Sequence, residues 1–171
     1  MDEIIVRFMN ALATHVMFIK NFFFYFEKIF ADITLNRNFS AQPIFNWISL
    51  LFFKTAMLYI MILFDDRPHN RYGFLSLIQH LEQTDTIDQE QLISVKNKYQ
   101  QFVQTNRTKI QACRAHLLIR GVPEMSGQDG EIIFLSAVTA YEIYIGLATL
   151  LQIERPAFRF LPPSSINDYV N

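Results

Sequence analysis

The sequence predicts an all-α protein, a helical bundle of about five helices followed by an extended, proline-containing C-terminal arm. Three observations lead to this prediction. Only 5 of the 171 residues are glycine, no stretch alternates apolar and polar residues with a period of two, and apolar residues recur at helical spacing over long runs. Few turns and long apolar runs are typical of a small number of long helices. We expect one helical domain over residues 1–154 and the arm over residues 155–171.

The first half of the chain contains two long helices and a short one. The first is expected from about Asp2 to Asp32, because its apolar residues recur every three or four positions. Ser40 can then cap a second helix over about 41–64, which is the most apolar of the set. A turn that contains a proline follows, and a short third helix is expected over about 72–83.

The clearest predicted element is a long fourth helix that ends at Arg120. Thr86 or Asp88 can cap its start, with a glutamine three residues later to complete a capping box. Gly121 followed by Pro123 ends it. Its apolar residues form one stripe, which consists of Leu92, Val95, Tyr99, Phe102, Val103, Ile110, Cys113 and Leu117.

A fifth helix is expected over about 131–153, after a polar turn. The residues expected to face the core are Ile132, Leu135, Val138, Tyr141, Ile145, Ala148 and Leu151. Pro156, Pro162 and Pro163 then keep the remaining chain extended, which is why an arm is predicted there.

Composition suggests an assembly rather than a lone monomer. The chain contains 17 phenylalanines, and large exposed apolar patches are rare on monomers. We therefore expect a homodimer. The formal charge of −1 provides no general attraction for a polyanion, so RNA binding would require a local basic strip or a larger protein or ribonucleoprotein partner. The single cysteine and the acidic N-terminus favour a cytoplasmic location over secretion.

A membrane interpretation rests on Trp47–Phe64, which is eighteen residues long and almost entirely apolar. Lys54 lies near its middle, where a charge in lipid costs roughly 2.5–3.5 kcal/mol. A helix buried in the centre of a bundle has the same pattern. We favour the buried helix and expect no membrane partner, with a small single-span membrane protein as an alternative.

The candidate chemistry lies near the end of the fourth helix. Taking about 100° per residue, Lys109 falls about 20° from His116 and Arg120 about 40° away, whereas Arg107 and Arg114 project to the opposite side. We call Lys109, His116 and Arg120 the basic strip. Cations near a helix C-terminus also stabilise the helix dipole, so a purely structural role is the simpler alternative.

The sequence predicts no cofactor and no metal site. It contains no glycine-rich loop before a helix and no histidine pair at i, i+4. His69 lies beside Asp65 and Asp66, but three such residues in one loop are weak evidence for a metal.

Over roughly Trp47–Leu151 the chain resembles the HEPN superfamily, in particular the HEPN domains of bacterial abortive-infection proteins. The resemblance lies in an apolar helix that ends in Leu-Phe-Asp-Asp at 63–66, a short leucine-rich helix at 74–78, and a long helix that reaches Ala115-His116. It implies a homodimer that places two basic motifs across a shared cleft. In active members the motif cleaves RNA without a metal: the histidine acts near the 2′-hydroxyl or the leaving oxygen, and an arginine stabilises the phosphate charge.

The motif departs from the family pattern in two ways. Members carry an arginine a few residues before the histidine, and the only basic residue in that window here is Lys109, which lacks the planar fork that binds phosphate through two parallel hydrogen bonds. Members also tend to carry an acidic residue shortly after the histidine, where this chain has Leu-Leu-Ile at 117–119. We therefore expect a catalytically degenerate accessory or interaction protein of an antiviral defence system, acting with a larger nucleic-acid-handling partner. The alternative is a metal-independent ribonuclease toxin that uses His116 with Lys109 or Arg120.

Overall fold

The computed structural model describes residues 3–35, 43–64, 73–84, 87–118 and 127–153, with side chains described outside 22–50, 52 and 113–130. The described residues form helices and no strand. The helices are α1 (Glu3–Leu35), α3 (Pro43–Phe64), α4 (Phe74–Glu82), α5 (Gln89–Thr105), α6 (Arg107–Leu118) and α7 (Gly127–Leu150). The predicted all-α bundle is thus confirmed. The predicted arm, residues 155–171, lies outside the described residues.

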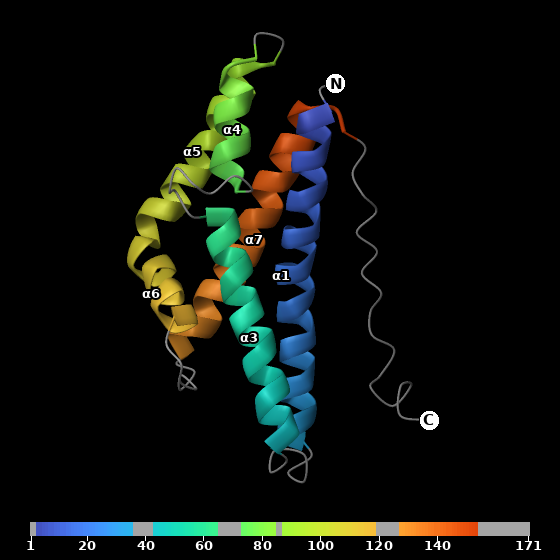
Figure 1. Ribbon diagram of the computed structural model, residues 1–171, viewed down its shortest axis with the longest axis vertical. Helices are drawn as coiled ribbons and strands as arrows, with labels where there is room; N and C mark the ends of the chain where they lie inside the picture. The colour runs from blue at the N-terminus through green and yellow to red at the C-terminus, as the bar shows by residue number, and fades with distance from the viewer. Residues whose placement is uncertain (1–2, 36–42, 65–72, 85–86, 119–126, 154–171) are drawn as a thin grey trace.

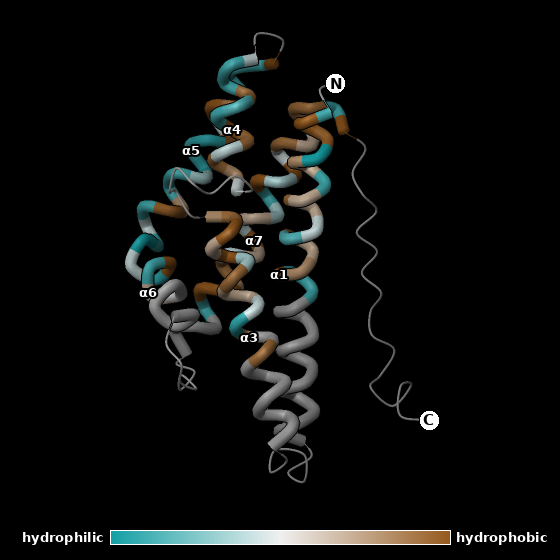
Figure 2. The backbone as a smooth tube through the Cα atoms, viewed as in Figure 1, coloured by the Kyte–Doolittle hydropathy of each residue, from teal (hydrophilic) through white to brown (hydrophobic). Residues whose placement is uncertain are grey.

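The long helices α1 and α7 pack against each other at the centre of the bundle. α1 packs against both α7 and α3, which also contact each other (Figure 1). α5 packs against α7 and α4, and α6 packs mainly against α3. α5 and α6 follow one another along one edge of the molecule, with α3 at the front (Figure 1). Figure 2 shows α5 as largely hydrophilic and the described parts of α3 and α7 as largely hydrophobic.

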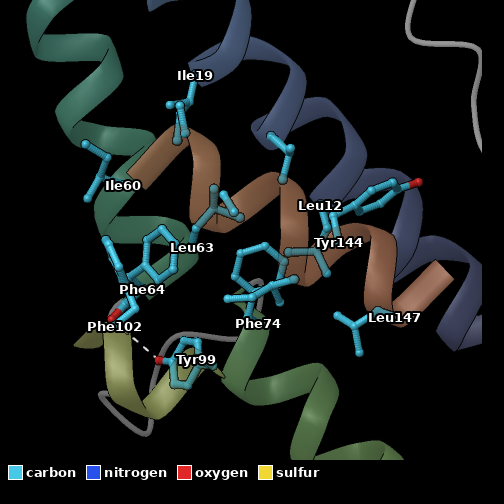
Figure 3. Close-up of a cluster of buried hydrophobic side chains, with 14 of the residues drawn as sticks. Leu12, Ile19, Ile60, Leu63, Phe64, Phe74, Tyr99, Phe102, Tyr144 and Leu147 are labelled. Carbon is cyan, nitrogen blue, oxygen red and sulfur yellow. Dashed lines mark hydrogen bonds between the residues drawn. The ribbon is translucent and has the colours of Figure 1, made fainter. Parts of the chain in front are cut away.

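The centre of the core is an aromatic cluster around Phe64, where α3, α4 and α5 meet (Figure 3). The Phe64 ring centroid lies 4.5 Å from that of Phe102 and 5.7 Å from that of Phe74. The Tyr99 hydroxyl donates a hydrogen bond to the Phe64 carbonyl at 3.5 Å. Tilted aromatic pairs at such distances contribute about 0.5–1.5 kcal/mol each beyond their burial, so this cluster holds the C-terminal half of α5 against the end of α3.

The predicted fourth helix is wrong in one respect, because it is divided at Asn106 into α5 and α6. Asn106 is 7% exposed, with φ −107° and ψ 14°. Its backbone N–H and its side-chain Nδ2 both donate to the Phe102 carbonyl, each at 3.0 Å. The first is the ordinary helical bond, and the second makes the side-chain amide share the same acceptor; side-chain bonds to the carbonyl four residues back often bend a helix.

The predicted core face of α7 is also partly wrong. Val138, expected in the core, is 41% exposed, and Leu135, Tyr141 and Ile145 are only half-buried. The buried residues are Ile132, Ile133, Ser136, Ala137, Ala140, Ile143, Tyr144, Leu147 and Ala148. α7 lies between α1 and α5, so its buried surface spans two flanks rather than one stripe.

Two helices bear on the membrane alternative, α3 and α7. Among the residues whose side chains the structure describes, the helical stretch Glu131–Leu150 is long and apolar enough to span a membrane, and half of it is buried inside the bundle; Phe53–Phe64 is a shorter apolar stretch. The predicted candidate span, Trp47–Phe64, lies in α3. Its described residues Phe53, Ile60 and Leu63 are at most 1% exposed and belong to the core, as in the central helix of a bundle.

Candidate functional site

The basic strip lies on α6 as far as the structure describes it. Lys109 and His116 both belong to α6, so the bend at Asn106 precedes both and leaves their mutual register unchanged. The two residues are seven positions apart on this helix, and the predicted orientation of His116 toward Lys109 stays a prediction. The side chain of His116 and the whole of Arg120 lie outside the described residues.

α6 is held in place by Ile110 and by its packing against α3. Ile110 is 7% exposed and belongs to the hydrophobic core. Its N–H donates to the Asn106 carbonyl at 2.9 Å, which restarts the helical hydrogen bonding directly after the bend. Because Ile110 is fixed in the core and the chain bends at Asn106, the side chain of Lys109, which precedes Ile110, reaches Glu131 of α7.

Lys109 carries an ion pair that the sequence did not predict. Its Nζ donates to Glu131 Oε2 of α7 at 2.9 Å. The two side chains are 39% and 56% exposed. A carboxylate at this distance is a partner of the Lys109 ammonium, although water screens an ion pair that is this exposed. Glu131 lies 22 residues from Lys109 in sequence and on another helix, so no local pattern pointed to it.

Two further lysines make the same kind of contact from α5. Lys98 donates to Glu142 of α7 at 2.9 Å, and Lys96 pairs with Glu82 of α4. Each of these pairs joins α5 or α6 to a neighbouring helix at the surface. The Lys109–Glu131 pair therefore follows a pattern of helix-to-helix ion pairs, which matches the structural alternative for Lys109.

A second histidine, His15 of α1, lies in an aromatic contact with α3. Its ring centroid is 4.9 Å from that of Tyr59 of α3, and Phe18 packs on the same tyrosine at 4.5 Å. His15 Nδ1 is buried without a hydrogen-bond partner among the described residues, and burial lowers the pKa of the imidazole. Burial of His15 in an aromatic contact between α1 and α3 favours a structural role for this residue.

The described residues contain no group of three or more His, Cys, Asp or Glu that could hold a metal ion. The weak candidate, His69 with Asp65 and Asp66, lies outside the described residues. Comparison of the chain with protein-family models, curated proteins and solved structures finds no match.

Proposed function

We propose that the chain is a HEPN-like, dimeric accessory or interaction protein of bacterial antiviral defence. It acts in the cytoplasm with a larger nucleic-acid-handling partner, and its own catalytic site is degenerate. The observation that carries the proposal is the Lys109–Glu131 ion pair. The only basic residue in the position that the resemblance gives to a phosphate-stabilising cation is already bound to a carboxylate.

Two features of Lys109 weaken phosphate binding: its ion pair with Glu131 and the shape of its charged group. A phosphate that approaches Lys109 meets the negative charge of Glu131 at the same ammonium group, 2.9 Å from Nζ. Lysine also offers a point charge instead of the fork with which arginine holds two phosphate oxygens. The formal charge of −1 gives the rest of the molecule little attraction for RNA to offset this.

One observation favours the ribonuclease alternative. Lys109 and His116 both belong to α6 and lie seven residues apart, so a cation precedes a proton-transfer group on one helix, as the resemblance implies for RNA cleavage. In that alternative RNA binding displaces Glu131, and His116 transfers the proton. The membrane alternative has less support, because the described inner face of α3 is buried in the bundle.

The proposal is tested by purifying the tagged full-length chain from its native cells and sequencing any nucleic acid that accompanies it. We expect a larger nucleic-acid-binding protein to co-purify in a fixed ratio, and RNA to be present only when that protein is. Repeated recovery of the chain without such a partner contradicts the proposal.

A second measurement separates the accessory role from the ribonuclease. Purified wild-type chain is incubated with single-stranded RNA in the presence of EDTA, beside the His116→Ala variant. We expect no difference between the two. Cleavage by the wild type that His116→Ala abolishes establishes the ribonuclease instead.

A further inference from the structure

α7 presents four apolar side chains on the face that lies between α1 and α5 (Figure 1). Phe134 is 45% exposed and Val138 is 41% exposed, and Tyr141 and Ile145 are half-buried. At about 100° per residue, these four positions fall within about 60° of one another. We call Phe134, Val138, Tyr141 and Ile145 the α7 strip. The strip leaves apolar surface uncovered in the part of the chain that the structure describes.

The two neighbours of α7 border the strip on opposite sides. Nζ of Lys20, from α1, lies 3.7 Å from the centroid of the Tyr141 ring. On the other side, Lys98 of α5 donates a hydrogen bond to the Glu142 carboxylate at 2.9 Å. A chain that covers the strip therefore runs lengthwise along α7.

The chain turns back on α7 where this helix ends. Gln152 has a φ of 52°, in the left-handed region that glycine usually occupies after a helix. Its N–H donates to the Thr149 carbonyl at 3.1 Å, and the Ile153 N–H donates to the Ala148 carbonyl at 2.9 Å. These two bonds form a Schellman motif, in which the residue after the left-handed one packs against the last turns of the helix. Ile153 does so, because it is half-buried and packs against the core.

This turn places the next residues beside the strip. Ala148, whose carbonyl accepts the bond from Ile153, lies about 60° around α7 from Ile145. A glutamine with positive φ is strained and keeps this conformation only where its surroundings hold it there. We therefore expect contacts after the turn as well as before it.

The predicted arm has the length that the strip requires. Val138 lies 15 residues before Ile153, which is about 22 Å of helix at about 1.5 Å per residue. An extended chain covers about 3.1–3.3 Å per residue, so the seven residues that end at Phe160 cover the same distance. By the same measure, Phe158 reaches about as far as Tyr141. Two residues apart in an extended chain, Phe158 and Phe160 can point to the same side.

The residue types of the arm also match the strip. Pro156, Pro162 and Pro163 surround the two phenylalanines and favour an extended backbone. Extended segments that contain proline bind surfaces lined by aromatic side chains, because they lose little conformational entropy on binding. The rings of Phe134 and Tyr141 provide such a surface on α7.

We propose that the C-terminal arm of the chain lies along the α7 strip of the same molecule, antiparallel to α7, with Phe158 and Phe160 against it. The arm, residues 155–171, lies outside the described residues. It begins directly after Ile153, so its concentration at the strip is of millimolar order, which favours it over the arm of a second copy. This contact is independent of the proposed function, because it involves neither the basic strip nor a partner.

The test measures how fast a thiol in the strip reacts with a maleimide dye. The full-length chain carries Cys113→Ser, which removes its native cysteine, and Val138→Cys. We expect this thiol to react slowly, because the arm covers it. Adding Phe158→Ser and Phe160→Ser should raise the rate by at least about 10-fold, because the arm then loses its apolar contacts with the strip.

Two controls match these variants. Ile166→Ser removes an apolar residue that an extended arm places beyond Phe134, so it should leave the rate unchanged. A thiol at Ile93→Cys lies on α5, at a position that is 54% exposed, and should react equally fast with either form of the arm.

Cross-linking decides the question if the arm variant loses its helical circular dichroism. In the Cys113→Ser chain, the pair Val138→Cys, Phe160→Cys should form a disulfide within one chain on mild oxidation. It should do so at least about 10-fold faster than the pair Ile93→Cys, Phe160→Cys, because only the first pair is held together.

Four outcomes overturn the inference. Two are equal labelling rates with and without the two phenylalanines, and equal cross-linking of both cysteine pairs. Protection of Val138→Cys that disappears on dilution assigns the strip to a second copy. Protection that appears only when phosphatidylglycerol vesicles are added assigns it to lipid.

Discussion

The ion pair between Lys109 and Glu131 gives the sharpest prediction about the basic strip. Because the two side chains are 39% and 56% exposed, water screens their interaction, and a surface pair of this kind contributes about 0.2–1 kcal/mol. Urea unfolding of Lys109→Met, Glu131→Gln and the double variant should give a coupling free energy in that range. The control cycle uses Lys98 and Glu142, which lie at the same 2.9 Å distance with exposures of 51% and 49%.

The same variants test whether the carboxylate withholds Lys109 from RNA. Glu131→Gln makes the Lys109 ammonium available to RNA. The slope of log K against log salt for single-stranded RNA should then become steeper by about 0.7. That gain should vanish when Lys109→Met is added, and the Lys98 cycle should show no such gain. If Lys109→Met weakens RNA binding as much in the wild type as it does beside Glu131→Gln, the carboxylate does not hold the lysine, and the reasoning is refuted.

Three further predictions concern stability. Gly146→Ala should gain about 1 kcal/mol of helix propensity, but its Cβ would lie 2.8 Å from Val95 Cγ2, and overpacking against this stiff side chain costs about 1–3 kcal/mol. We therefore expect urea unfolding to show a lower free energy of unfolding, which Val95→Ala partly restores; a stabilised Gly146→Ala variant contradicts this. Leu12→Ala, at a position that is 0% exposed, should lower the free energy of unfolding by about 3–5 kcal/mol, and a loss under about 1 kcal/mol argues against its place in the core. Burial lowers the pKa of His15, so its contribution to stability should be fully present above its ordinary pKa of 6.5 and be lost as the pH falls through that value toward the folded-state pKa. His15→Leu should therefore reduce the fall in the free energy of unfolding at acidic pH. An equal fall in the wild type and the variant contradicts the assignment.

Local signals in the sequence predicted the start and the buried face of α5 correctly. The Asp88 carboxylate accepts hydrogen bonds from the N–H groups of Glu90 and Gln91 at 3.0 and 3.1 Å, as a helix cap should. Leu92 and Tyr99, expected in the apolar stripe, are 1% and 2% exposed. Both features depend on residues within a turn or two of each other and on a helix with one clearly polar side, so spacing alone identifies them.

The features that the sequence did not predict depend on contacts between distant residues. Asn106 is an ordinary polar residue in the sequence, and it breaks the helix because its amide is buried beside the Phe102 carbonyl. α7 has apolar residues on most of its surface, so periodicity does not select the face that meets α1 and α5. The partner of Lys109 was missed for the same reason, because Glu131 is brought to it only by the packing of α6 and α7.

Part of the exposed apolar surface lies on α3, where Leu51 and Leu58 are 67% and 47% exposed while Phe53 and Ile60 are buried. The composition predicts surplus apolar surface but not its position on the fold, because a helix that is apolar on most of its surface has no periodicity that distinguishes the buried face from the exposed one. Only the packing of α1, α6 and α7 against α3 decides which of its apolar residues enter the core.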